Sequence, residues 1–213
     1  MTHINYKSFL LAIITMLTFV PHASPQHVRL QALASHGVHV SSLGRAGLEF
    51  DCIVIGADMM HEITLHEHNS QKIVVFAVDA PSQHDVSVWV DVFDNDKLVL
   101  RDPGGYSPTP GIPLEIRFAY ANKGYANNNT IWQNALHDAI ELPAGSRYAS
   151  FPISSMAGPV FEQANSAKQT ERAYLFFYGS LGPASPGENL PSGVYETSIT
   201  VHIDLMHRYN PDH

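Results

Sequence analysis

The stretch Gly193–Leu205 reads GVYETSITVHIDL, and its alternating pattern decides the fold class. Every second residue belongs to the set Tyr195, Thr197, Ile199, Val201, Ile203 and Leu205, and the residues between them are mostly polar. A period of two indicates an extended strand with one buried side, because a helix would scatter these positions around its circumference. We therefore expect a core strand, entered through a turn at 190–193. At such a corner the Tyr195 hydroxyl can bond back to nearby backbone.

Similar alternation recurs along the chain, in short runs separated by turn residues. The runs are 28–40, 48–54, 63–65, 72–79, 86–92, 98–100, 114–120 and 173–180, with Pro- and Gly-rich loops at 101–113 and 182–193. Residues 94–97 are expected to form the turn of a hairpin. This density of strands and turns predicts an all-β protein, specifically a single Ig-like antiparallel Greek-key sandwich.

One segment, 127–145, departs from the strand pattern. Thr130 and Gln133 have the spacing of a helix capping box, and helical spacing relates Trp132, Leu136, Ala139 and Ile140. The segment predicts a short helix inserted into the β-fold.

The N-terminal residues resemble a targeting segment. Lys7 precedes the apolar run Phe9–Val20, which is too short to cross a bilayer comfortably and is typical of a secretory signal peptide. We expect residues 1–24 to be removed, leaving one exported domain, 25–213. No second apolar run of spanning length follows, so no membrane span is expected in the mature chain.

Composition excludes several classes of function. The 213 residues carry a formal net charge of −8, which argues against nucleic acid or anionic lipid as the main partner. The single cysteine, Cys52, cannot form an intramolecular disulfide and is expected to be a small buried residue. The sequence contains no Gly-x-Ser-x-Gly elbow, Gly-rich phosphate loop or His-Glu-x-x-His motif. We therefore expect neither enzymatic activity nor a cofactor.

Two features leave a binding function open. His66 and His68 would share one face of a strand and could bind one metal ion, with copper favoured by the neighbouring methionines. Solvent-facing histidines are the alternative interpretation. Trp89 and Phe93 lie opposite the apolar face of their strand, where they either form an exposed sugar- or protein-binding face or are covered by a helix or loop.

Two stretches together resemble a known family. They are the long alternating segment Val28–Val40 near the start of the exported chain, and the sequence LPSGVYETSITVHI at 190–203. The combination is similar to subunits of chaperone–usher pili, especially the archaic, spore-coat-U-like group. The final strand of that group reads roughly Gly-x-Tyr-x-Asp-Thr-(Ile/Val)-Thr-Val. Here Glu196 replaces the Asp, and Ser198 precedes Ile199.

The resemblance implies assembly into a surface fimbria by donor-strand exchange. The subunit's sandwich would lack its last strand, and a periplasmic chaperone would fill the resulting groove. At the outer-membrane usher, the N-terminal segment of the neighbouring subunit would replace the chaperone by strand addition. The donor segment would be 26–35, and the groove would lie between an early strand at 36–40 and the strand 195–205. The implied groove plugs are Val28, Leu30, Ala32 and Ala34; the implied groove strand presents Tyr195, Ile199, Val201, Ile203 and Leu205.

The alternative is a self-contained exported sandwich that binds a sugar, a protein or copper. The two hypotheses differ in the position of residues 26–35. A self-contained sandwich pairs this segment within the molecule, whereas a donor segment projects from it.

Overall fold

Strands form within each of the alternating runs of the sequence in the computed structural model. The structure describes residues 25–51, 61–65, 71–82, 84–92, 96–101, 111–125, 132–155, 170–183, 190–191 and 193–207. The strands are β1 Gln26–Ala34, β2 His39–Leu43, β3 Gly47–Phe50, β4 His61–Ile63, β5 Val74–Pro81, β6 His84–Val92, β7 Lys97–Leu100, β8 Ile112–Ala121, β9 Ile140–Glu141, β10 Tyr148–Pro152, β11 Thr170–Leu181 and β12 Tyr195–His207. One short helix, α2, spans Trp132–Leu136. The predicted all-β sandwich is confirmed.

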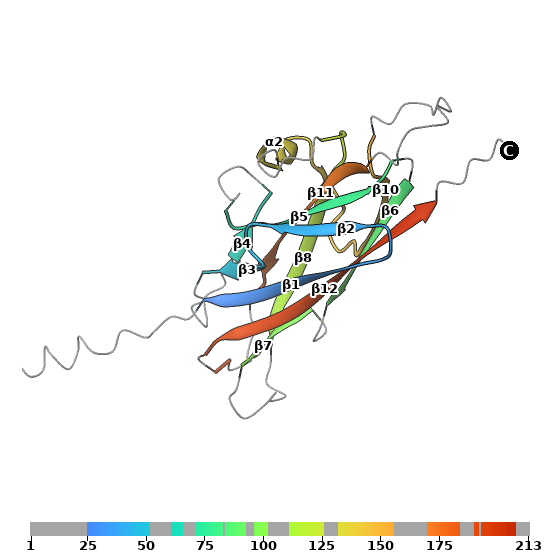
Figure 1. Cartoon of the computed structure of the whole chain (residues 1–213). Coiled ribbons are helices and arrows are strands. Elements are labelled where there is room, and N and C mark those ends of the chain that lie inside the picture. Colours follow the sequence, from blue (N-terminus) through green and yellow to red (C-terminus); the bar gives the residue numbers. More distant parts are fainter. Residues whose placement is uncertain are drawn as a thin grey trace, which may run out of the picture.

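The strands form two layers (Figure 1). Layer A has the order β3–β1–β12–β6–β10, and layer B has the order β2–β5–β11–β8–β9, with β4 beside the end of β11. Strand β7 pairs with both β12 and β8, so the two layers belong to one curled sheet. Among the described residues, no helix is long and apolar enough to cross a membrane.

The core lies between the layers, where the alternating residues of each strand meet. In β12 the side chains of Ile199, Val201 and Ile203 are fully buried, Tyr195 is nearly so, and Leu205 is half-buried. The predicted core strand is therefore confirmed. Layer B is buried on both faces along most of β11, and α2 packs against this strand.

The inserted helix is shorter than the helical spacing predicts. It ends at Leu136, and Ile140 instead begins β9, where it pairs with Tyr120 of β8 and is 49% exposed. Pairing with the edge of layer B supplies backbone hydrogen bonds that a continued helix would have made internally. The expectation that Ala139 and Ile140 continue the helix was wrong, and Thr130 lies outside the described residues.

The expected hairpin at 94–97 does not form. Both β6 and β7 pair with β12, through Val92 opposite Ile199 and Val99 opposite Glu196. Strand β7 therefore continues in the direction of β6 along β12, instead of reversing beside β6. Asp96, just before β7, has φ of 62°, a conformation that Asp tolerates better than most residues. Residues 94 and 95 of the expected turn lie outside the described residues.

The alternating run 28–40 splits into two strands at a turn. Val38 donates a backbone hydrogen bond to Ser35, and Gly37 has φ of 89°. Beyond this turn the chain crosses to layer B, where β2 pairs with β5. Strand β1 consequently runs parallel to β12, so the sandwich is not antiparallel throughout as expected.

The Tyr195 hydroxyl donates a 2.8 Å hydrogen bond to the carbonyl of Pro191, confirming the bond back to the entering turn. Burial raises the pKa of Tyr195, so the hydroxyl remains a donor at neutral pH. A Tyr195→Phe variant should lose about 1 kcal/mol of unfolding free energy. The urea midpoint from tryptophan fluorescence measures this loss, and an unchanged midpoint would contradict the role of the bond.

Candidate functional site: the seat of strand β1

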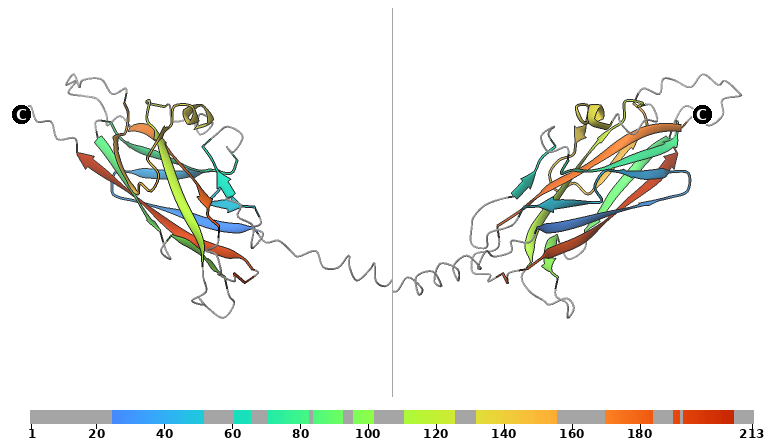
Figure 2. Two further views of the ribbon diagram at one scale, coloured as in Figure 1. Left: turned by 180° about the vertical axis from the view of Figure 1, so that it is seen from behind. Right: turned by 60° about the vertical axis from the view of Figure 1, so that its left-hand side comes forward.

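The first strand of the described chain lies in the interior of layer A. Strand β1 is parallel to β12 over eight residue pairs, from His27 opposite Glu196 to Ala34 opposite Ile203. Its other side is antiparallel to β3 over residues 26–29. Both views of Figure 2 show β1 and β12 running side by side. We call the position between β12 and β3 the β1 seat.

The inward side chains of β1 are buried in a gradient. Val28 is fully buried, Leu30 is 6% exposed, Ala32 is half-buried, and Ala34 is exposed. Three of the four sequence-predicted plugs therefore contact the core, and the fourth does not. The bordering early strand is β3, not residues 36–40 as expected, because the turn at Gly37 sends the chain to layer B.

Polar side chains tie both ends of β1 to β12. The side-chain oxygen of Gln26 accepts a 2.7 Å hydrogen bond from the Tyr195 amide, and Gln26 is only 4% exposed. At the other end, the Ser35 amide donates to the Ile203 carbonyl at 3.0 Å, and the Ser35 hydroxyl accepts from the Leu205 amide at 3.2 Å. Sequence reasoning did not identify Gln26, because a lone amide outside a motif gives no signal of its partner.

Gly47 permits the close approach of β3 to β1. A Cβ at this position would lie 2.4 Å from the Val28 carbonyl oxygen. A Gly47→Ala variant must push the two strands apart, so we expect a loss of about 1–3 kcal/mol of unfolding free energy. Ala46→Ser, at the exposed neighbouring position, is the control for urea denaturation. Equal midpoints for the two variants would contradict the close packing at Gly47.

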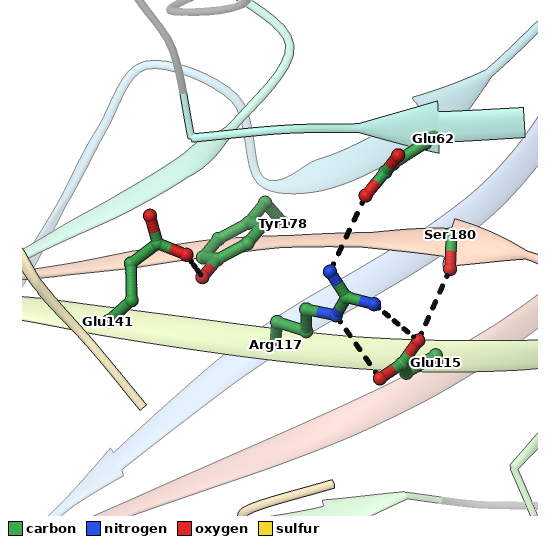
Figure 3. A network of polar contacts seen from close by, with 6 residues as sticks. All are labelled: Glu62, Glu115, Arg117, Glu141, Tyr178 and Ser180. Atoms are coloured by element: carbon green, nitrogen blue, oxygen red, sulfur yellow. Dashed lines mark hydrogen bonds and ion pairs between the residues drawn. The ribbon is translucent and has the colours of Figure 1, made fainter. Parts of the chain in front are cut away.

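A polar network on layer B joins four strands (Figure 3). Arg117 donates to Glu115 at 2.9 and 3.1 Å and to Glu62 at 3.4 Å, while the Tyr178 hydroxyl donates to Glu141 at 2.8 Å. The Arg117 hydrogen bonds lower the pKa of Glu115, and burial raises the pKa of Tyr178. The pKa shifts of Glu115 and Arg117 both favour their charged forms, and that of Tyr178 favours the neutral phenol. The network therefore resembles a structural tie more than a proton-transfer site.

On the outer face of layer A, the Trp89 ring stacks on His202. The ring centroids are 4.8 Å apart with an interplanar angle of 9°, and His202 Nε2 lies 3.0 Å from an Asp91 carboxylate oxygen. Trp89 is thus half-buried by a neighbouring side chain, which neither sequence interpretation anticipated.

The other candidate residues cannot be placed. His66, His68, Cys52 and Phe93 lie outside the described residues. Within the described ranges, no three His, Cys, Asp or Glu side chains are grouped so that they could hold a metal ion.

No protein-family model matches the chain, and no curated protein matches it either. The functional argument therefore depends on the β1 seat and on the sequence resemblance.

Proposed function

We propose that this chain is an exported structural subunit of a surface fimbria that polymerises by exchanging β1 between copies. Pairing of β1 within its own chain is what the self-contained alternative expects, so the proposal is carried, beside the sequence resemblance, by the way in which β1 is attached. It fills an interior place in layer A, between β12 and β3, yet only residues 35–38 connect it to the rest of the described chain. A strand held in this way can leave its seat without unthreading any other described strand.

An empty seat is unfavourable, so a chain whose β1 has left its seat can be expected to take up the β1 of another copy. Withdrawal of β1 would leave without partners those backbone groups of β12 that face β1 over residues 196–203, and exposed strand edges recruit other strands. It would also expose the part of the core that Val28 and Leu30 cover. Burial of each of these side chains stabilises the fold by about 1.5–3 kcal/mol. The β1 of a second copy restores all of these contacts, so exchange conserves them and responds to protein concentration.

The fimbrial partners come from the sequence resemblance. We propose neighbouring copies of the subunit as permanent partners, with a periplasmic chaperone occupying the seat in transit and an outer-membrane usher catalysing the replacement. Because β1 occupies the seat of its own chain here, assembly requires its release from that seat.

A self-contained exported binding module is the second candidate function. The observation that favours it is the pairing of residues 26–34 within their own chain, which this alternative expects. In that case β1 never leaves its seat.

The two candidates differ in gel mobility. Mature protein prepared from the periplasm and run on SDS gels without boiling should form a ladder that collapses to monomer on heating. Val28→Asp should abolish the ladder and Ala34→Asp should preserve it, because Val28 is fully buried and Ala34 is exposed. A monomer alone, at every protein concentration and before heating, would overturn the fimbrial proposal.

A further inference from the structure

A groove lies at the start of β1, outside the strand seat itself. It has a volume of about 540 Å³ and is lined by β1, the 45–49 segment, Arg101 and the start of β12. Three arginines, Arg29, Arg45 and Arg101, and two glutamates, Glu49 and Glu196, carry the charge of its lining. We call this hollow the arginine groove.

The groove concentrates positive charge in an acidic protein. Three of the chain's 12 lysines and arginines line it, although the formal net charge of the chain is −8. Two carboxylates oppose three guanidinium groups, so the lining has an excess of positive charge. At physiological ionic strength, charges beyond about 8 Å are largely screened. The local excess therefore governs what enters the groove.

Two of the three arginines are incompletely neutralised by their partner. Arg29 and Arg101 share the carboxylate of Glu196, at 3.9 and 3.6 Å, and their side chains are 68% and 63% exposed. Each guanidinium has five N–H donors, more than half of one carboxylate can accept. Arg45, in contrast, is paired with Glu49, and Arg172 on layer B donates to both carboxylate oxygens of Asp79 at 2.7 Å.

We propose that the arginine groove binds an acidic polysaccharide, a sugar polymer that carries carboxylate or sulfate groups. The planar guanidinium fork matches the paired oxygens of these anions. A glycan also supplies hydroxyl donors, which the carboxylates of Glu49 and Glu196 can accept. The side chains of an acidic peptide supply acceptors alone, and the same two glutamates would repel them. The mixed lining therefore favours a glycan over an acidic peptide.

The groove is complete only when β1 occupies its seat, because Arg29 belongs to β1 and the other two arginines do not. In the single chain all three come from one molecule. In the fibre, and resting on the proposed function, each groove would combine Arg29 of one copy with Arg45 and Arg101 of its neighbour.

Calorimetric titration of the monomeric fraction tests binding independently of fibre formation. The probes are polygalacturonate for carboxylate, dextran sulfate for sulfate, neutral dextran and poly-glutamate. We expect at least one acidic polysaccharide to bind, with an affinity that falls as salt rises, and both neutral dextran and poly-glutamate to bind at least tenfold more weakly. The stronger of the two acidic polymers identifies the preferred anion.

Matched variants locate the site. The double variant R29Q/R101Q should lose at least tenfold in affinity, as should R101Q/R45Q, which leaves β1 unaltered. The control K72Q/R147Q removes two comparably exposed positive charges outside the groove and should bind as the parent does. Unchanged binding by both groove variants, an equal loss in the control, equal binding of poly-glutamate, or no binding of either acidic polymer at low salt would each overturn the proposal.

Discussion

A Val28→Asp variant is expected to lose about 4 kcal/mol of unfolding free energy, the largest effect of any single substitution in β1. Val28 is fully buried between β12 and β3, so the new carboxylate would either remain charged without a partner or force β1 out of its seat. Either result lowers the unfolding free energy by a large fraction, because a typical domain has an unfolding free energy of only about 5–15 kcal/mol. Urea denaturation of the mature chain, followed by tryptophan fluorescence, measures the loss.

Ala34→Asp is the matched control, because it places the same carboxylate on the same strand at an exposed position. We expect its unfolding free energy to stay within about 0.5 kcal/mol of the parent. If Val28→Asp and Ala34→Asp have the same urea midpoint, then β1 does not contribute to the core as described.

The second large effect concerns the buried ion pair between Arg172 and Asp79. Arg172 of β11 donates two hydrogen bonds of 2.7 Å to the two carboxylate oxygens of Asp79 on β5, and the side chains are only 5% and 10% exposed. Arg172→Met leaves a buried carboxylate whose other ion-pair partner, among the residues that the structure describes, is His39, with Nδ1 3.7 Å away and a side chain that is 77% exposed. We expect a loss of about 3–5 kcal/mol of unfolding free energy.

A double variant separates the cost of the orphaned charge from the value of the pair. R172M/D79L removes both charges and should recover much of the loss, since well-packed apolar pairs often replace buried ion pairs at little cost. The control is Arg147→Met, which breaks an exposed pair with Asp96 and should cost at most about 1 kcal/mol. A double variant no more stable than Arg172→Met would contradict this account.

Alternation sufficed to predict which residues face the core. Ile199, Val201 and Ile203 are buried because one side of a strand must meet the opposite layer, and a period of two marks that side without knowledge of its partners. The hydrogen bond from the Tyr195 hydroxyl to the Pro191 carbonyl was also predictable, because the two residues are only four positions apart in the sequence.

Strand partners were not predictable, because they depend on contacts between distant residues. The turn at Gly37 decides that β1 and β2 lie in different layers, and β7 continues the line of β6 instead of reversing beside it. The sequence indicated a turn at 94–97 and one continuous alternating run at 28–40, and neither pattern specifies the partner of the strand that follows. Helical spacing around Ile140 was likewise overridden by pairing with β8.

The candidate sites likewise divide into features that local sequence predicts and features that depend on contacts between distant residues. Val28 and Leu30 were predictable as residues of one strand face from their alternation, whereas Gln26 and the arginine groove were not predictable. Arg29, Arg45 and Arg101 come from separate parts of the sequence and form no motif. Only the fold brings them together.

Strand exchange is tested most directly by a covalent trap in a Cys52→Ala background. Gln31 of β1 pairs with Thr200 of β12, and adjacent strands lie close enough for a disulfide. One chain carries Q31C and a second carries T200C; the two are mixed, allowed to exchange and oxidised. The control replaces T200C by S150C, at an exposed position on β10.

Exchange of β1 predicts a disulfide-linked heterodimer of the Q31C and T200C chains on non-reducing gels, well above the yield with S150C. The double variant Q31C/T200C, oxidised as a dilute monomer, should close the same bond within one chain. If that internal bond forms while the mixed chains give no heterodimer above the control, β1 stays in its own seat and the protein is a self-contained sandwich.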